Sequence, residues 1–302
     1  MILVTGGTGF IGEALLRSLK VTGDKFRIIS RTDVIGVETI KCDFLNDEIP
    51  NDCFKDVSTI FHLAGFAHDF SDASKIEHIY KQINVNTSVR LAELAVKNNV
   101  KKFIYVSSVK AGGSSIKNNC YSEEDQGIPE GICGKTKREA ELKILKIGKE
   151  SNMRVIIIRP SLVYGPNLKG NLYKMYSGIK KGWFPPIPET GNIRSMIHVD
   201  DLVRAILFLS NNKLIDGEIF IATDGKNYST SEIYKIFSII LGKNIPKWHV
   251  PIFLFTFAGM VNSKMNYKIQ KLLGDECYSS EKLNLLGFQA KLSLKDLNET
   301  IF

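Results

Sequence analysis

Short runs of apolar, mostly β-branched residues alternate with longer amphipathic stretches along the first half of the chain. Almost every residue of the short runs is apolar, which is typical of strands covered on both faces in a parallel sheet. The runs predict strands at Ile2–Val4, Phe26–Ile29, Thr59–Leu63, Phe103–Val106 and Val155–Ile158. Parallel strands need crossovers, and apolar residues at helical spacing predict helices at Ile11–Leu19, Ile79–Lys97 and Lys135–Ile147.

The alternation loosens after Pro160 into Gly-, Asn- and Pro-rich sequence that continues to Gly191. It resumes with a helix from Asp201 and a strand at Glu218–Ala222, and the residues from Ser229 onward predict mainly helices. This order indicates an α/β fold, a doubly wound parallel sheet with a smaller, mainly helical lobe. We expect the sheet domain at residues 1–164, completed by about 193–225, and the lobe at 165–192 and 226–302.

A glycine-rich turn, TGGTGFIG at residues 5–12, links the first predicted strand to the first predicted helix. Gly6 permits the tight turn, Gly9 lets the backbone approach a pyrophosphate, and Gly12 lets the helix lie close to the sheet. The free N–H groups of that helix face the anion. The turn predicts a Rossmann dinucleotide site whose contacts include Gly6, Thr8, Gly9, Phe10, Ile11 and Gly12.

The end of the second strand bears on the choice between NAD and NADP. An acidic residue there accepts a hydrogen bond from the ribose 2′-hydroxyl, whereas a cation suits a 2′-phosphate. Ser30 and Arg31 stand at this place, and a guanidinium binds phosphate bidentately. We expect NADP on the strength of Arg31, while nearby Asp33 keeps NAD open.

Composition and charge narrow the remaining classes of function. The net charge of +8 comes from lysines spread along the chain without a nucleic-acid motif, so we expect an anionic small molecule and no nucleic acid. Five scattered cysteines, with no CxxC pair and no histidine at zinc-ligand spacing, predict a reducing compartment and no metal site. The start lacks the pattern of a signal peptide, which favours a cytoplasmic protein.

The longest apolar stretch, about Val250–Val261, is too short to cross a bilayer, so no stable membrane insertion is expected. We predict a buried helix there, with a contact to a membrane surface as the alternative.

Several further motifs occur in one order along nearly the whole chain, and together they resemble a known family. They are the TGGTGFIG turn, His62–Gly65, Ser107-Ser108, Arg159-Pro160 with Tyr164-Gly165-Pro166, and Arg194–Asp201. This set resembles the extended short-chain dehydrogenase/reductases, the nucleotide-sugar epimerase/dehydratase group. The resemblance implies a UDP-sugar held between two lobes, oxidised or reduced at C4 by the nicotinamide, for surface polysaccharide synthesis. It also allows a homodimer.

The catalytic motif of that family departs from its usual form here. The family uses Ser or Thr with Tyr and Lys, the last two as YxxxK on a helix that faces the nicotinamide. The matching segment places Cys133 where the tyrosine stands, with Lys137 four residues later and Ser108 shortly after the predicted strand Phe103–Val106. The resemblance implies that Ser108 orients the sugar oxygen, while Lys137 holds the nicotinamide ribose and lowers a neighbouring pKa.

Cys133 leaves three interpretations open: a weakened or inactive variant, an enzyme with water or another residue as proton relay, and a non-catalytic binder of nucleotide sugars. A thiol with a reference pKa of about 8.5 exchanges protons near neutrality. However, it ends well short of a phenol oxygen, and general catalysis needs hydrogen-bond distance or one bridging water. A packing role for Cys133 is compatible with all three interpretations.

The resemblance assigns the rest of the site residue by residue. On the cofactor side these residues are Asp43, Phe44, Leu63, Ala64, Gly65 and Pro160, and on the substrate side Ser108, Lys110, Asn171 and Arg194. His68 is a further candidate for substrate contact. Arg194 suits two phosphate oxygens, but as an alternative it pairs with Asp200 or Asp201.

We expect His62 and His198 to be structural, with Asp200 as the cap of the following helix. The leading hypothesis is therefore an NAD(P)-dependent 4-reductase or 4-epimerase of a UDP-hexose, a UDP-N-acetylhexose or a 4-keto-6-deoxyhexose. A reductase consumes NADPH, whereas an epimerase retains NAD⁺, and Arg31 favours the former. The alternative from another class is a catalytically silent dinucleotide or nucleotide-sugar sensor, because the fold alone does not guarantee activity.

Overall fold

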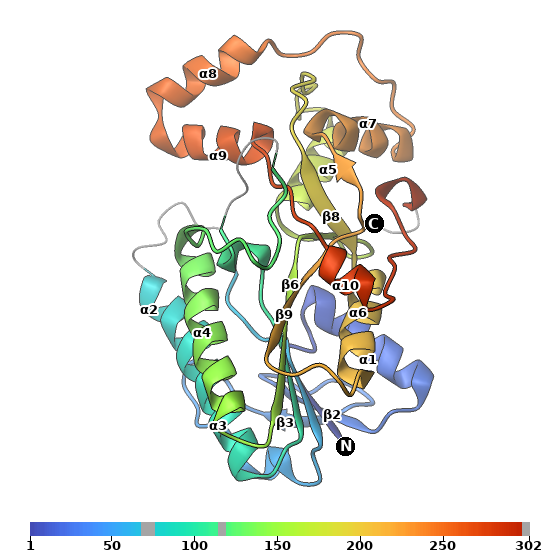
Figure 1. Cartoon of the computed structure of the whole chain (residues 1–302). Coiled ribbons are helices and arrows are strands. Elements are labelled where there is room, and N and C mark those ends of the chain that lie inside the picture. Colours follow the sequence, from blue (N-terminus) through green and yellow to red (C-terminus); the bar gives the residue numbers. More distant parts are fainter. Residues whose placement is uncertain (68–75, 114–118, 298–302) are drawn as a thin grey trace.

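Seven parallel strands form the central sheet of the molecule, in the order β3-β2-β1-β4-β5-β6-β9 (Figure 1). The computed structural model describes residues 1–67, 76–113 and 119–297. The strands are β1 (Ile2–Thr5), β2 (Phe26–Ser30), β3 (Glu38–Lys41), β4 (Thr59–His62), β5 (Lys102–Val106), β6 (Arg154–Pro160) and β9 (Glu218–Ala222). All neighbouring pairs run parallel, so the predicted parallel α/β sheet is confirmed.

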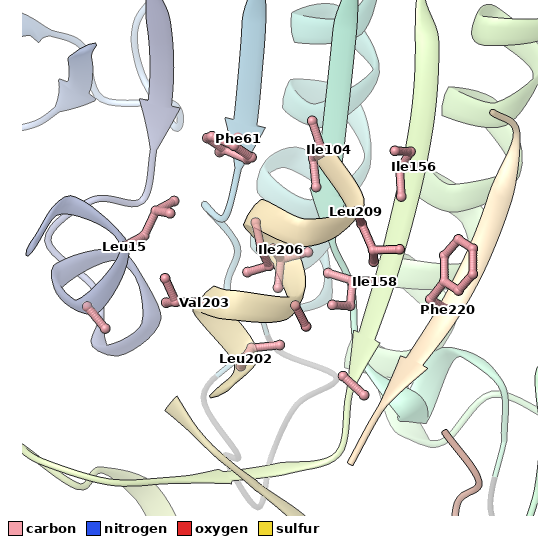
Figure 2. Close-up of a cluster of buried hydrophobic side chains, with 14 of the residues drawn as sticks. Leu15, Phe61, Ile104, Ile156, Ile158, Leu202, Val203, Ile206, Leu209 and Phe220 are labelled. Carbon is pink, nitrogen blue, oxygen red and sulfur yellow. The ribbon is translucent and has the colours of Figure 1, made fainter. Parts of the chain in front are cut away.

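Helices cover both faces of this sheet, which explains its continuous apolar strands. Along β5, Phe103 and Tyr105 point into one core, whereas Ile104 and Val106 point into the other. The helices α3 (Ser88–Lys97) and α4 (Gly131–Lys149) lie on the first face, and α1 (Phe10–Thr22) and α6 (Val199–Asn211) lie on the second. Figure 2 shows Leu202, Ile206 and Leu209 of α6 against the strands.

The helix expected at Ile79–Lys97 is divided into three parts. A short α2 (Glu77–Tyr80) leads into a π-helical segment at Lys81–Thr87, and α3 follows. The π-helical segment widens the backbone spiral around the buried residue Asn84. Such segments occur frequently at functional sites, and periodicity in the sequence does not distinguish them from an ordinary helix.

A second, three-stranded sheet follows the carboxyl end of β6. Its strands are β10 (Asn227–Tyr228), β8 (Arg194–His198) and β7 (Leu162–Tyr164), in that order. The helices α5 (Gly170–Lys181) and α7 (Thr230–Ile240) enclose a separate apolar core with this sheet. The helices α8 (Ile252–Val261) and α9 (Ser263–Leu273) lie at the outer end of the molecule, and α10 (Glu281–Leu285) returns beside β9 (Figure 1). The predicted domain limits stay a prediction.

Two sequence predictions are wrong, one about the burial of a helix and one about the cysteines. The helix at Val250–Val261 forms as α8, but it is exposed rather than buried, because it is the outermost element and only Gly259 is fully covered.

The second concerns the cysteines. Cys120 and Cys277 form a disulfide, contrary to the reduced state expected for all five cysteines. Residues far apart in sequence meet there because Tyr121 pairs with Tyr278 in an isolated parallel bridge. No helix within the described ranges is long and apolar enough to cross a bilayer.

Candidate functional site

The glycine turn between β1 and α1 has the geometry of an anion cradle. Gly6 has a φ of 72°, and a Cβ there would lie 2.6 Å from the backbone nitrogen of Ala64. A Cβ on Gly12 would collide with the carbonyl oxygen of Gly6. Gly9 precedes α1 without a side-chain cap, so no side chain of this residue satisfies the first N–H groups of the helix, the groups that bind an anion in such turns. The turn therefore fits a pyrophosphate.

The ends of β4 and β5 bring Gly65 and Lys137 into contact next to this turn. The ammonium Nζ of Lys137 donates to the carbonyl of Val106 at 3.1 Å and lies 4.7 Å from the ring centre of Tyr105. A Cβ on Gly65 would stand 2.8 Å from the same Nζ. Only a residue without a Cβ leaves room here for the ammonium. Gly65 and Lys137, both predicted site residues, therefore lie together beside the glycine turn.

Burial lowers the pKa of Lys137 to about 8, although the neighbouring Cys133 and Glu141 oppose this effect. With a pKa of about 8 the side chain is still mostly protonated at neutral pH, which suits a group that stabilises a neighbouring anion.

Cys133 lies one helical turn before Lys137, near the start of α4 and partly exposed. The start of α4 packs against the turn after β5, because the backbone nitrogen of Glu130 donates to the carbonyl of Lys110 at 2.9 Å. In that turn the hydroxyl of Ser108 accepts from the backbone nitrogen of Lys110 at 3.3 Å. The structure thus brings the turn of Ser108 to the end of α4 that carries Cys133.

Asn84 is a positioning residue that the sequence analysis missed. Its amide nitrogen donates to the carbonyl of Phe66 at 3.0 Å and to the hydroxyl of Thr136 at 3.1 Å, and its oxygen accepts from the nitrogen of Phe66 at 2.7 Å. These bonds tie the loop after β4 to α4, one residue before Lys137. The sequence offered one signal for this role, because the polar side chain of Asn84 interrupts an amphipathic helix pattern.

A buried ion pair, also missed, anchors α4 to the sheet. The guanidinium of Arg159 donates to both carboxylate oxygens of Glu141, at 2.9 and 2.6 Å, and both side chains are 0% exposed. Glu141 lies one turn beyond Lys137, so this pair fixes the helix that carries the lysine. In the sequence, Arg159 is recognisable only as part of a family motif, and nothing there marks its pairing with Glu141.

The adenosine side of the predicted site is more open. Arg31 is exposed after β2, and the carboxylate of Asp33 pairs with the ammonium of Lys41 at 2.7 Å. The carboxylate of Asp43 accepts from the backbone nitrogen of Leu45. Phe44 packs partly against the core, and Leu63 donates its backbone N–H to Thr5 at 3.1 Å. None of these contacts decides between NAD and NADP, so the preference for NADP inferred from Arg31 stays a prediction.

On the substrate side, Arg194 is buried in β8 and is paired with Glu276 through Nη1 at 2.9 Å. Its alternative pairing with Asp200 or Asp201 is wrong, because those carboxylates bind Arg17 and Arg204. Among the described residues the Nη2 of Arg194 is buried without a hydrogen-bond partner.

The other substrate candidates have contacts of their own. Lys110 lies 3.7 Å from the carboxylate of Glu130, measured from its Nζ. Asn171 is exposed in the first turn of α5, and within the described ranges no hydrogen bond joins it to Arg194. Pro160 ends β6, and His68 lies outside the described residues.

Two histidines have structural surroundings. His62 is fully buried, with Nδ1 2.6 Å from the hydroxyl of Thr5 and Nε2 2.7 Å from that of Ser88, and burial lowers its pKa to about 3. His198 itself caps α6 by accepting from the backbone nitrogen of Asp200, so the prediction that Asp200 is the cap was wrong. In the part of the chain that is described, no group of three or more His, Cys, Asp and Glu side chains is arranged to hold a metal ion.

Comparison with known proteins places this geometry in a family. The family model of the NAD dependent epimerase/dehydratase family matches residues 2–222. A UDP-glucose 4-epimerase of Vibrio cholerae is 32% identical over 83% of this chain and 78% of its own length. An N-acetyl-alpha-D-glucosaminyl-diphospho-ditrans,octacis-undecaprenol 4-epimerase of Escherichia coli O157:H7 is 24% identical over 97% of this chain and 91% of its own.

A solved structure has the same fold. The UDP-glucuronic acid 4-epimerase of Bacillus cereus, in complex with UDP-glucuronic acid and NAD, superposes with a TM-score of 0.80 at 21% identity, over 98% of this chain and 95% of that one. The fold and the family model agree with the glycine cradle, the buried lysine and the order of the motifs. The chain therefore belongs to the NAD-dependent epimerase/dehydratase family.

Proposed function

We propose that this protein is an NAD-dependent 4-epimerase of a sugar carried on a diphosphate, in which Cys133 takes the place of the proton-exchanging tyrosine. The observation that carries the proposal is the buried Lys137, held beside the glycine cradle one turn after Cys133. A lysine so placed binds the nicotinamide ribose of a dinucleotide that lies in the cradle. The names of the two relatives, both 4-epimerases, support epimerisation over reduction.

The residues at the end of α4 divide the work at the sugar. Ser108 orients the oxygen on C4 by a hydrogen bond, and Cys133 exchanges the proton of that oxygen, directly or through one bridging water. Lys137 stabilises the anionic state of the exchanging group by its charge. A dinucleotide held by the glycine cradle and Lys137 would supply reversible hydride transfer at C4, with no net redox change.

The diphosphate is assigned to Arg194. Its Nη1 is held by Glu276, while the buried Nη2 has no partner among the described residues. A buried guanidinium nitrogen without a partner is costly unless a ligand satisfies it, and a phosphate oxygen is a suitable acceptor. A UDP-hexose or UDP-N-acetylhexosamine is the first candidate substrate. A polyprenyl-diphosphate sugar is the second, favoured by the exposed apolar helix α8 and by the name of the relative that matches 97% of this chain.

The test is turnover of a panel of UDP-hexoses and their N-acetyl forms, followed by product NMR and nicotinamide absorbance, for this protein and its Cys133→Tyr and Cys133→Ala variants. We expect the Tyr form to be faster than the Cys form by about tenfold or more, because the phenol reaches the sugar without a water. The Ala form should be the slowest. A reductase would instead consume NADPH in proportion to product, the outcome favoured by Arg31.

Absence of turnover in both the Cys and the Tyr form, with dinucleotide and UDP-sugar still bound, would contradict the enzyme and favour the sensor. Equal rates for the Cys and Ala forms would assign the proton to water or to another residue.

A further inference from the structure

The helix α8 presents a stripe of large apolar side chains to the outside of the molecule. Phe253, Phe257, Met260 and Val261 recur at helical spacing, and they are 67%, 66%, 79% and 73% exposed. Trp248, just before the helix, is 64% exposed. Single exposed apolar residues are ordinary, but a contiguous row of this kind indicates an interaction surface.

Along the chain, the residues on either side of this stripe carry charge of one sign. Although 32 of the 302 residues are acidic, none lies between Glu232 and Asp275, whereas six lysines do. Two of them, Lys247 and Lys268, are exposed on either side of α8 in the sequence. Apolar side chains flanked by lysines, with no carboxylates, are the composition of helices that lie in the interface of an anionic bilayer.

An apolar groove of about 320 Å³ runs between α8 and α9. Leu254, Phe255 and Ala258 of α8 line one side, and Met265, Ile269 and Leu272 of α9 line the other, with Lys268 among them. The groove therefore offers hydrocarbon contact next to a cation, which matches the chemistry of a lipid acyl chain below its phosphate.

The hairpin of α8 and α9 is also linked to the proposed catalytic end of α4. The Nζ of Lys271 in α9 lies 4.0 Å from the carboxylate of Glu130, which immediately precedes α4. Figure 1 shows α8 farther from the seven-stranded sheet than α9. A surface that bound α8 would thus hold the site at a fixed distance from itself.

We propose that α8 docks this protein on the surface of an anionic lipid bilayer, with the stripe Phe253, Phe257, Met260 and Val261 in the headgroup region and the lysines on lipid phosphates. The helix has 10 residues, too few to span the hydrocarbon core. A second copy fits the face less well, because a two-fold interface places like patches together and would oppose lysines with lysines. The docking does not depend on catalysis.

The experiment is co-sedimentation of the full chain with vesicles of equal parts phosphatidylcholine and phosphatidylglycerol, and with phosphatidylcholine alone. We expect binding to the anionic vesicles, weaker in high salt, and lower by about tenfold or more in the double variant Phe253→Ser with Phe257→Ser. The matched control is Ile35→Ser with Leu214→Ser, two apolar residues exposed elsewhere on the molecule, which should bind as the unchanged protein does. A Trp183→Phe variant leaves Trp248 as the single tryptophan, and brominated lipid should quench it.

Three results would overturn the proposal: no binding to the anionic vesicles at low salt, equal binding by the two Ser double variants, or a dimer in solution that the Phe257→Ser change dissociates. A Lys137→Ala variant separates this proposal from the proposed function, since it should lose turnover and keep vesicle binding. Phe253→Ser with Phe257→Ser should keep turnover of a soluble UDP-sugar. Failure of one proposal therefore leaves the other intact.

Discussion

Neutralising Glu141 should destabilise the protein more than any exposed charge on the same helix. Its carboxylate binds Arg159 through two hydrogen bonds, and water reaches neither side chain. In Glu141→Gln the guanidinium stays buried and loses the carboxylate that binds it. Among the described residues the Nη1 of Arg159 already lacks a hydrogen-bond partner. No unused acceptor near the guanidinium is therefore at hand to replace the carboxylate. Removing one member of a buried ion pair costs about 3–5 kcal/mol, a large share of a total stability of about 5–15 kcal/mol.

The measurement is urea unfolding of Glu141→Gln followed by two probes, circular dichroism and fluorescence, whose transitions must coincide. Glu139→Gln is the control, because Glu139 forms a half-exposed ion pair with Lys143 on the same helix and should cost less than about 1 kcal/mol. The double change Glu141→Leu with Arg159→Met should recover most of the loss, since it leaves no buried charge. A cost below about 1 kcal/mol for Glu141→Gln would refute the reasoning.

Three further predictions follow from the site. In Gly12→Ala the new Cβ meets the carbonyl of Gly6, so dinucleotide affinity by calorimetry should fall by at least tenfold, whereas Gly23→Ala, in open space, should leave it unchanged. His62 has a folded pKa of about 3 against an ordinary 6.5; the unfolded chain binds the proton first, so stability should fall as pH drops from 6.5 towards 3, and less steeply in His62→Asn. Arg194→Met should weaken UDP-sugar binding by about tenfold or more without changing the affinity for NAD, and equal losses for both ligands would assign Arg194 a general structural role.

Six strands of the sheet could be predicted from the sequence because they are mostly apolar on both faces, whereas the edge strand β3, which contains no fully buried residue, was not predicted by its pattern. The five strands predicted in the first half of the chain lie within two residues of their expected ends, and Glu218–Ala222 matches β9 fully. The turn at Gly6, Gly9 and Gly12 was predictable for a related reason, since each glycine meets backbone that a Cβ would strike or crowd. These are local constraints, so spacing along the chain carries them.

Contacts between distant residues could not be predicted from spacing. Arg194 pairs with Glu276 rather than with the nearby Asp200, because an isolated bridge sets the two side by side. Cys120 meets Cys277 across a sequence separation of 157. The exposure of α8 also escaped prediction, since an apolar run reads alike whether it faces a core or the outside. The bonds of Asn84 also escaped prediction, since periodicity in the sequence does not distinguish a π-helical segment from an ordinary helix.

The position of β9 has a consequence for the synthesis of the chain. This strand completes the large sheet beside β6, yet β7, α5, β8 and α6 are translated between them. A nascent chain that ends before Glu218 therefore presents the apolar, unpaired edge of β6, the kind of edge that pairs with other chains. Ribosome-bound intermediates of this length therefore expose an edge that is prone to aggregation and that a chaperone could cover.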